Sequence, residues 1–147
     1  MSIIRITKEF RFEGAHALFN YDGKCKHIHG HSYILFVTVK GTPAIKPGEA
    51  KDGMLIDFSD LKAIVNSNII DVFDHALVLK ESALLTEEIA QAYGSVIITD
   101  FQPTCENMIS YFASKIKDKL PENVSLFSLK LYETATSYVE WFAEDNA

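Results

Sequence analysis

Apolar and polar positions alternate in four stretches of the chain, which is the pattern of half-buried β-strands. In residues 3–14, Phe10 and Phe12 fall on one face, and charged residues fall on the other. The remaining strands are predicted at residues 32–40, 124–133 and 137–142. The turn dipeptide Asp22-Gly23 lies between the first two strands, so we expect these strands to pair antiparallel.

Two other stretches carry apolar residues at the spacing of a helix that buries one face. The first helix is predicted within residues 54–73, with Ser59 as its N-cap. The second is predicted within residues 103–120, with Thr104 as its N-cap and Glu106 in its first turn. The buried stripe of the second helix is predicted to contain Met108, Ile109, Phe112, Ile116 and Leu120.

The order of these elements predicts an α+β fold, in which a four-stranded antiparallel sheet has two helices packed on one face. Between the helices, residues 80–101 are expected to add a short helix after Thr86 and a short strand at residues 95–99. At 147 residues the chain fits a single domain, residues 1–147, that can bury a hydrophobic core.

Composition and charge narrow the class of protein. The net charge of −6 argues against a nucleic-acid surface, which would carry a basic stripe. No apolar run is long enough to span a membrane, and "MSIIRITKEF" lacks the apolar segment of a signal peptide. With only Cys25 and Cys105 present, a disulfide framework is not expected, and a cytoplasmic location is favoured.

Candidate chemistry concentrates in the heptapeptide "CKHIHGH", which holds three of the five histidines. His29 and His31 are two residues apart at the start of a strand, so both side chains leave the same face. His16 ends the partner strand with the parity of its apolar residues, which would bring three imidazoles together. Three imidazoles with one open position form a common catalytic zinc site. His27 has the same parity and is the alternative ligand, ranked lower because it lies in the loop.

Cys25 has two possible roles beside such a site. It could be a fourth metal ligand, which would close a structural zinc site. Alternatively, it could be a thiol held just beyond the metal, where a nearby cation favours the thiolate near neutral pH.

Two carboxylates are further candidates. Asp74 can orient the adjacent His75, although neighbouring side chains need not point together, and a surface pair fits the sequence equally well. Glu133 is expected to share one face of its strand with Phe127, Leu129 and Leu131. A carboxylate in an apolar stripe is costly to bury unpaired, so Glu133 either reaches water or, as we prefer, accepts hydrogen bonds from a ligand.

Six segments occur in a specific order along the chain: "FRFEGAH", "CKHIHGH", "GMLIDFSDLK", "DH", "PTCEN" and "YET". Together they resemble the 6-pyruvoyltetrahydropterin synthase / 6-carboxytetrahydropterin synthase family, which is the pterin branch of the tunnelling fold. The resemblance implies that Cys25 is the catalytic thiol and that His75, oriented by Asp74, is its acid/base partner. The zinc ligands would be His16, His29 and His31. The pterin pocket would be formed by Glu133, which anchors the N–H edge, with Thr104 and Glu106.

The family's substrate is 7,8-dihydroneopterin triphosphate, from which triphosphate is eliminated. An apolar residue before H-G-H, here Ile28, makes the chain more similar to the bacterial carboxy-forming branch. That branch releases acetaldehyde and makes 6-carboxytetrahydropterin for queuosine and other deazapurines, whereas the pyruvoyl branch stops earlier. The resemblance also implies a homo-oligomer, a trimer or a dimer of trimers, whose sheets close into a barrel and whose sites form between subunits.

The chain departs from the family pattern at Ala17, where a basic residue is usual, and at Val78 and Leu79, where a Leu-Asn pair is usual. The segment at residues 76–102 is also longer than in short family members. These differences bear on triphosphate recognition, for which the nearest obvious cations are Lys24 and Lys26. The alternatives are a paralogue acting on a different pterin and a non-enzymatic, zinc-stabilised structural protein.

Overall fold

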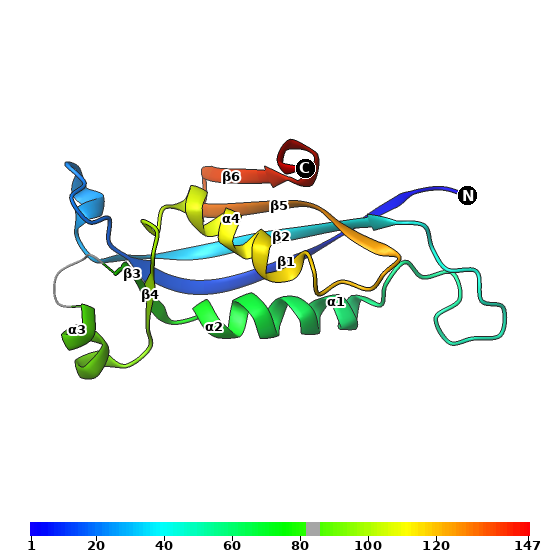
Figure 1. The fold of residues 1–147 in the computed structure, drawn as a ribbon, viewed down its shortest axis with the longest axis horizontal. Coiled ribbons are helices and arrows are strands. Elements are labelled where there is room, and N and C mark those ends of the chain that lie inside the picture. The colour runs from blue at the N-terminus through cyan, green and yellow to red at the C-terminus, as the bar shows by residue number, and fades with distance from the viewer. Residues whose placement is uncertain (82–85) are drawn as a thin grey trace.

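A six-stranded sheet forms the main layer of the computed structural model, which describes residues 1–81 and 86–147 (Figure 1). The strand order is β4-β3-β1-β2-β5-β6. The strands are β1 Ile4–His16, β2 His29–Gly41, β3 Ala76–Lys80, β4 Val96–Thr99, β5 Val124–Thr134 and β6 Ser137–Phe142. The helices are α1 Phe58–Val65, α2 Asp71–Phe73, α3 Thr86–Tyr93 and α4 Cys105–Ile116, with a π-helical turn at Asn66–Ile70 between α1 and α2. The α+β class is therefore confirmed.

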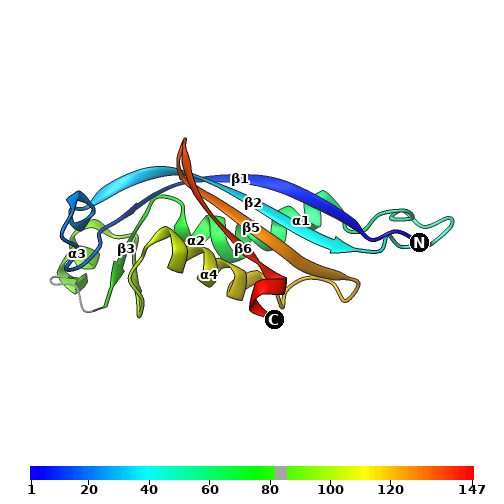
Figure 2. The same cartoon turned by 90° about the horizontal axis from the view of Figure 1, so that it is seen from above.

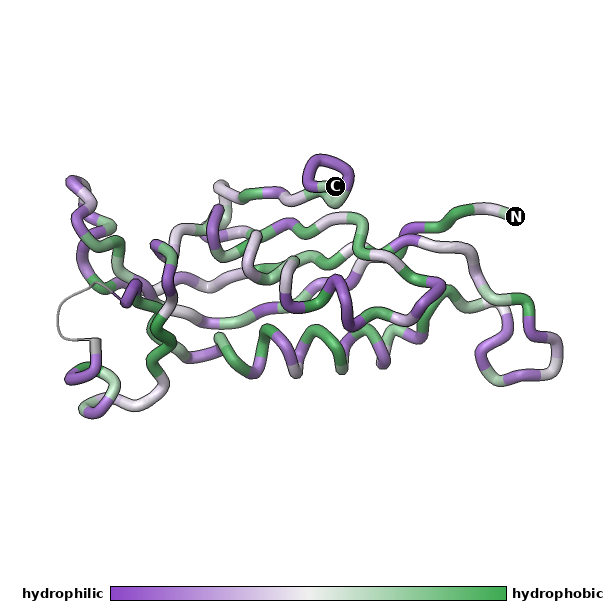
Figure 3. Tube along the Cα trace, viewed as in Figure 1, coloured by the Kyte–Doolittle hydropathy of each residue, from purple (hydrophilic) through white to green (hydrophobic). Residues whose placement is uncertain are grey.

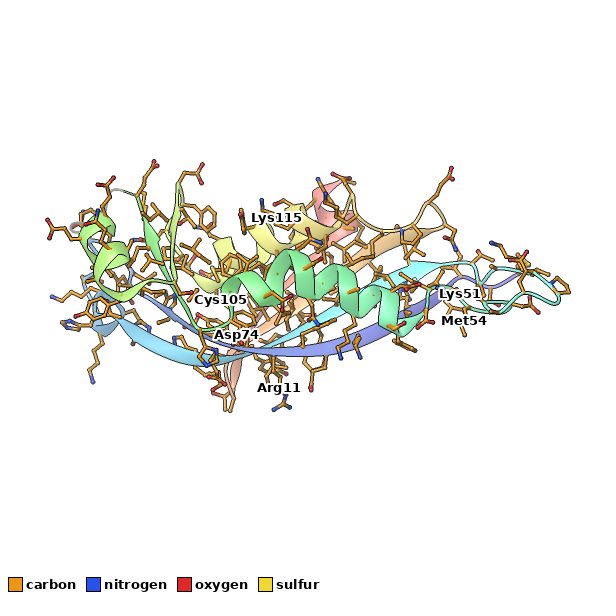
Figure 4. The ribbon with its side chains drawn as sticks, turned by 90° about the horizontal axis from the view of Figure 1, so that it is seen from below. Arg11, Lys51, Met54, Asp74, Cys105 and Lys115 are labelled. Carbon is orange, nitrogen blue, oxygen red and sulfur yellow. The ribbon has the colours of Figure 1, made fainter. Side chains whose placement is uncertain are left out.

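The β1–β2 hairpin determines where the histidines lie. The two strands pair antiparallel from Ile4 opposite Gly41 to His16 opposite His29. Alternate side chains of both strands face α1, α2 and α4, which lie on one side of the arched sheet (Figure 2). Arg11 projects to the other side of the sheet (Figure 4). The alternation of apolar and polar residues thus places one set of side chains in the core.

The core lies between this face of the sheet and the helices. Hydrophobic and hydrophilic residues alternate along α1, as expected for a helix that buries one side (Figure 3). Phe112 of α4 is fully buried, and its ring meets those of Phe12 and Phe73 edge-on at centroid distances of 5.9 and 5.0 Å. In the described part of the chain, no helix is long and apolar enough to cross a membrane.

Replacing Phe112 by alanine is expected to lower the free energy of unfolding by about 4 kcal/mol, because a cavity would open between Phe12 and Phe73. Urea denaturation at a fixed protein concentration measures the change. A loss below about 1 kcal/mol would show that this part of the core collapses around the deletion or is not packed as described.

The sheet is wider than the predicted four-stranded antiparallel sheet, because two further strands, β3 and β4, join it parallel to β1. The β1 residues Gly14–His16 pair with β3, and β3 pairs along its length with β4. The helix after Thr86 and the strand near residues 95–99 were expected, but β3 was not. Its sequence, "ALVLK", is a short apolar run without alternation, as is usual for a buried parallel strand.

Two local predictions were wrong. The N-cap of α1 is Asp57 rather than Ser59, because the Asp57 carboxylate accepts a hydrogen bond from the Ser59 backbone N–H at 2.8 Å. Phe127 does not share a face with Leu129 and Leu131, because the register of β5 shifts beside it. Its ring instead lies under the Arg5 guanidinium at 4.1 Å, and Leu126 occupies the buried position.

Candidate metal centre and the cavities beside it

Three imidazoles converge at the end of the β1–β2 hairpin. His16 is the last residue of β1, and His29 and His31 are the first and third residues of β2. Because His16 pairs directly with His29, all three side chains leave the helix-facing side of the sheet together. One nitrogen from each ring lies within 4.8 Å of those of the other two, so the three could hold a metal ion.

Backbone carbonyls determine which ring nitrogens carry protons. The His16 Nδ1 lies 2.6 Å from the carbonyl of Pro103, and the His29 Nδ1 lies 2.7 Å from the carbonyl of His27. A carbonyl can only accept, so each Nδ1 donates and each Nε2 of a neutral ring carries a lone pair. These two Nε2 atoms are 3.0 Å apart. Two lone pairs at this distance repel each other unless a cation lies beside them, which is the arrangement of a metal site.

The third ring completes this arrangement. In the described part of the chain, the His31 Nε2 is buried and makes no hydrogen bond. It lies 3.1 Å from Glu133 Oε1, but the geometry is not that of a hydrogen bond. A buried nitrogen without a partner is costly, and coordination of a metal ion would satisfy it. The residues therefore fit a cation with three imidazole ligands.

The electrostatic surroundings favour neutral rings, which metal binding requires. Burial lowers the pKa of His16 and of His31 below the usual value of 6.5. The mutual proximity of the rings lowers the pKa of both further, whereas the Glu133 carboxylate raises it. The neutral forms of His16 and His31, with free lone pairs, are thus favoured near pH 7.

The metal-free protein is expected to lose stability on mild acidification. The unfolded chain takes up these protons near pH 6.5, whereas the folded protein takes them up only at lower pH. The contribution of these histidines to the free energy of unfolding is thus complete above pH 6.5. It is lost as the pH falls through their pKa values in the folded protein. Urea midpoints at pH 7.5 and 5.5 measure this, and His16→Gln should weaken the dependence. A midpoint that is equal at both pH values would contradict the burial of neutral imidazoles.

Cys25 lies in a short 3-10 helix at Lys24–Lys26, in the loop between β1 and β2. Its half-buried side chain lines a cavity of about 460 Å³. Other residues lining this cavity are His16, Thr104, Glu106 and Glu133. The structure thus brings together the thiol, one ring of the triad and all three residues expected to bind substrate.

The N-terminus of α4 forms one side of this cavity. Thr104 caps the helix as predicted, since its hydroxyl accepts from the Asn107 backbone N–H at 3.2 Å. Cys105 is buried, and burial raises the pKa of its thiol. The protonated Sγ lies 3.7 Å from the Leu131 carbonyl, to which it donates. The two cysteines of the chain therefore differ in environment, and only Cys25 is partly exposed.

The side chains of Asp74 and His75 are in contact, although adjacent residues in a sequence need not point the same way. The His75 Nδ1 lies 3.0 Å from Asp74 Oδ1, which also accepts from the Glu13 backbone N–H at 2.9 Å. The His75 backbone N–H donates to the Glu13 carbonyl at 2.6 Å, and the residue has a φ of 61°. The Glu13 N–H is the main cause that lowers the pKa of Asp74, followed by His75.

His75 faces a different cavity from Cys25. Its side chain is 77% exposed and lines a cavity of about 710 Å³ together with Glu13, His31 and Ser32. The thiol and the candidate acid/base pair of one chain therefore lie in separate cavities.

A protein-family model described as 6-pyruvoyl tetrahydropterin synthase matches residues 5–144. The chain belongs to the 6-pyruvoyl tetrahydropterin synthase family. This confirms the family that the ordered motifs resemble.

Curated relatives within the family match over nearly the whole chain. A Haemophilus influenzae protein named 6-carboxy-5,6,7,8-tetrahydropterin synthase is 37% identical, over 95% of this chain and 99% of that protein. A Rickettsia conorii protein of the same name is 31% identical, over 94% of this chain and 99% of that protein. These relatives therefore have nearly the same extent as this chain.

Solved structures of family members share the fold. The Caenorhabditis elegans 6-pyruvoyl tetrahydropterin synthase aligns with a TM-score of 0.67 and 24% identity, over 97% of this chain and 96% of that chain. The Plasmodium vivax 6-pyruvoyl tetrahydropterin synthase aligns with a TM-score of 0.71 and 16% identity, over 96% of this chain and 98% of that chain. At these identities the likeness concerns the fold alone.

Two departures from the family pattern have a structural reason. Val78 and Leu79 stand where a Leu-Asn pair is usual, and both are buried in β3. The segment at residues 76–102, which the sequence suggests is longer than in short family members, contains the parallel extension β3-α3-β4. This segment supplies two strands of the sheet next to His16.

Sequence reasoning missed the residues that position the site. Gln102 accepts from the Phe19 N–H at 3.1 Å and donates to the Phe19 carbonyl at 2.7 Å, and so holds the loop that contains Cys25. Pro103 and Glu13 act through their backbone groups. A contact made by a backbone group does not depend on the residue type, so the sequence does not reveal it. Gln102 lies 83 positions from Phe19, so no local sequence pattern indicates that contact either.

Proposed function

We propose that the chain is a zinc-dependent 6-carboxy-5,6,7,8-tetrahydropterin synthase. It would convert 7,8-dihydroneopterin triphosphate to 6-carboxytetrahydropterin, with release of triphosphate and acetaldehyde, for queuosine and other deazapurines in the cytoplasm. The observation that carries the proposal is the convergence of three imidazoles, one of which, His16, shares a cavity with Cys25. The 37% identity to the H. influenzae protein of that name supports the choice of reaction.

Zn²⁺ is the ion that we assign to His16, His29 and His31. Three neutral imidazoles with an open fourth position suit zinc, and the carbonyls that accept from two Nδ1 atoms orient their rings. Zinc held there supplies Lewis acidity, which lowers the pKa of a substrate hydroxyl group. Cys25 is not a ligand in this proposal, because the donor atoms that lie within 4.8 Å of one another are those of the three rings, without the Cys25 Sγ.

Cys25 is the base that removes a proton from the substrate side chain. His75 delivers and accepts protons, and the Asp74 carboxylate stabilises its charged form. Because Cys25 and His75 of one chain line separate cavities, His75 would act on the substrate of a neighbouring subunit. We therefore propose a trimer or a dimer of trimers with sites between subunits.

The sheet edges support such an assembly. Within the described residues, β1 pairs with β3 only over Gly14–His16, which leaves the edge of β1 from Ile4 to Glu13 open. Among the described strands, β6 lies at the other end of the sheet and pairs only with β5. Open edges of this length invite pairing with another chain, and closing the sheets into a barrel would satisfy both.

Glu133 would anchor the pterin by accepting hydrogen bonds from its N–H groups. The carboxylate is only a quarter exposed and lines the Cys25 cavity, where Thr104 and Glu106 form the wall at the start of α4. The exposed Lys24 and Lys26 flank the thiol and are the cations that we assign to the triphosphate.

Product analysis tests this function. The zinc-loaded protein is incubated with 7,8-dihydroneopterin triphosphate, and with 7,8-dihydroneopterin as the dephosphorylated comparison. We expect acetaldehyde and 6-carboxytetrahydropterin in equal amounts from the triphosphate. A pyruvoyl product without acetaldehyde would assign the chain to the pyruvoyl reaction, and turnover of the dephosphorylated compound alone would indicate a paralogue. Failure to consume either compound would contradict the proposal.

A further inference from the structure

The extension β3-α3-β4 is anchored next to the three histidines. In β1, Gly14 pairs with Ala76 and His16 pairs with Val78. The Leu77 N–H donates to the Ser95 carbonyl at 3.0 Å, which links the start of β3 to the residue that precedes β4. The extension therefore has a defined position relative to the metal centre, and Figure 1 shows α3 at that end of the molecule.

The end of α3 determines where Tyr93 lies. Gly94 has a φ of 77°, which glycine adopts without strain, and its N–H donates to the Ala90 carbonyl at 3.0 Å. The helix consequently stops at Tyr93, which is 84% exposed. A tyrosine ring held at the end of a capped helix and left open on most of its surface is available for contact with a ligand.

Tyr93 lines the same cavity of about 710 Å³ as His75. The residues that line this cavity include His75 and Glu13, whose carboxylate accepts from the Ser32 hydroxyl at 2.6 Å. Apolar and aromatic residues of the extension, among them Ile89 and Tyr93, line it as well. A cavity of this size, lined by apolar residues and a few polar groups, is typical of a site for a small molecule.

The charged and polar groups of this cavity include the Glu13 carboxylate and the His75 ring, whose Nδ1 lies 3.0 Å from Asp74 Oδ1. A polar ligand with a flat, polarisable ring can pair with these groups and pack against tyrosine at the same time.

We propose that Tyr93 is a substrate-binding residue whose ring packs against the face of the pterin, with Ile89 extending the apolar wall. This inference rests on the proposed function, because that function directs His75 toward the substrate and Tyr93 shares the cavity of His75. The longer segment at residues 76–102 would then add a specificity-determining wall to a site whose metal, thiol and pterin anchor lie elsewhere in the chain.

Kinetics of Tyr93→Ala and Tyr93→Phe with 7,8-dihydroneopterin triphosphate test this role. Tyr93→Ala is expected to raise KM about tenfold with kcat little changed, because packing against the ring is lost but the reacting groups remain. Tyr93→Phe, which keeps the ring, should restore the KM of the unchanged protein. Ile98→Ala is the matched control, since Ile98 is exposed in the same extension but does not line the cavity.

Three results would overturn the proposal. The first is an unchanged KM for Tyr93→Ala in an enzyme that is otherwise active. The second is a change in the oligomeric mass of Tyr93→Ala, measured by light scattering, which would mean that a neighbouring chain covers the ring. The third is equal binding of neopterin, followed by its fluorescence, to the unchanged protein and to Tyr93→Ala. This binding measurement tests the role of Tyr93 even if the protein does not turn over the triphosphate, a result that would contradict the proposed function.

Discussion

Replacing Cys25 by alanine is expected to reduce kcat with 7,8-dihydroneopterin triphosphate by about 1,000-fold, because the proposed base is lost. The bound zinc should stay at one ion per chain, since Cys25 is not among the three residues whose nitrogens converge. Stopped assays for substrate loss give the first quantity, and metal analysis after dialysis gives the second.

The other cysteine supplies a matched control. Cys105→Ala also removes a thiol, but from a buried site where burial raises its pKa and keeps it protonated. We expect this variant to retain kcat within a few-fold. If Cys25→Ala lost its zinc and unfolded, the thiol would be a structural ligand, and the non-enzymatic alternative would be favoured. Full activity of Cys25→Ala would show that the thiol takes no part in the reaction.

His29→Ala is expected to weaken zinc binding by about 100-fold or more and to abolish turnover at ordinary zinc concentrations. Its Nε2 lies 3.0 Å from that of His16, so the variant leaves two of three donors and opens the centre to water. The half-buried position of His29 in β2 should allow the chain to fold. Competition with a chromophoric chelator measures the affinity, and circular dichroism checks the fold.

His27→Ala is the corresponding control. His27 was the alternative ligand at the sequence level, but its backbone carbonyl, rather than its ring, takes part in the centre by accepting from His29 Nδ1. The carbonyl remains in the alanine variant, so zinc affinity should stay within a few-fold of the original. Loss of zinc from His27→Ala with retention in His29→Ala would reverse the assignment of the third ligand.

The triad could be predicted from the sequence because strand geometry is periodic. His29 and His31 are two residues apart, and hairpin pairing brings His16 opposite His29, so local rules suffice. Thr104 was likewise identified by its position before a helical stripe. In such cases the positions of the site residues follow from their types and their spacing along the chain.

Other features depend on contacts between distant segments. β3 pairs with β1 across about 60 positions, and its apolar run does not distinguish a buried strand from a piece of helix. The shift of Phe127 out of the buried face arises from a β-bulge, which depends on the partner strand β2. The separation of Cys25 and His75 into two cavities is a property of the folded chain that their motifs do not encode.

X-ray absorption at the zinc edge of the loaded protein tests the central claim most directly. We expect three imidazole nitrogens and one oxygen at about 2.0–2.1 Å, with no sulfur in the coordination shell. A sulfur scatterer at about 2.3 Å would show Cys25 bound to the metal, and the thiol could not then act as the base that this account assigns to it.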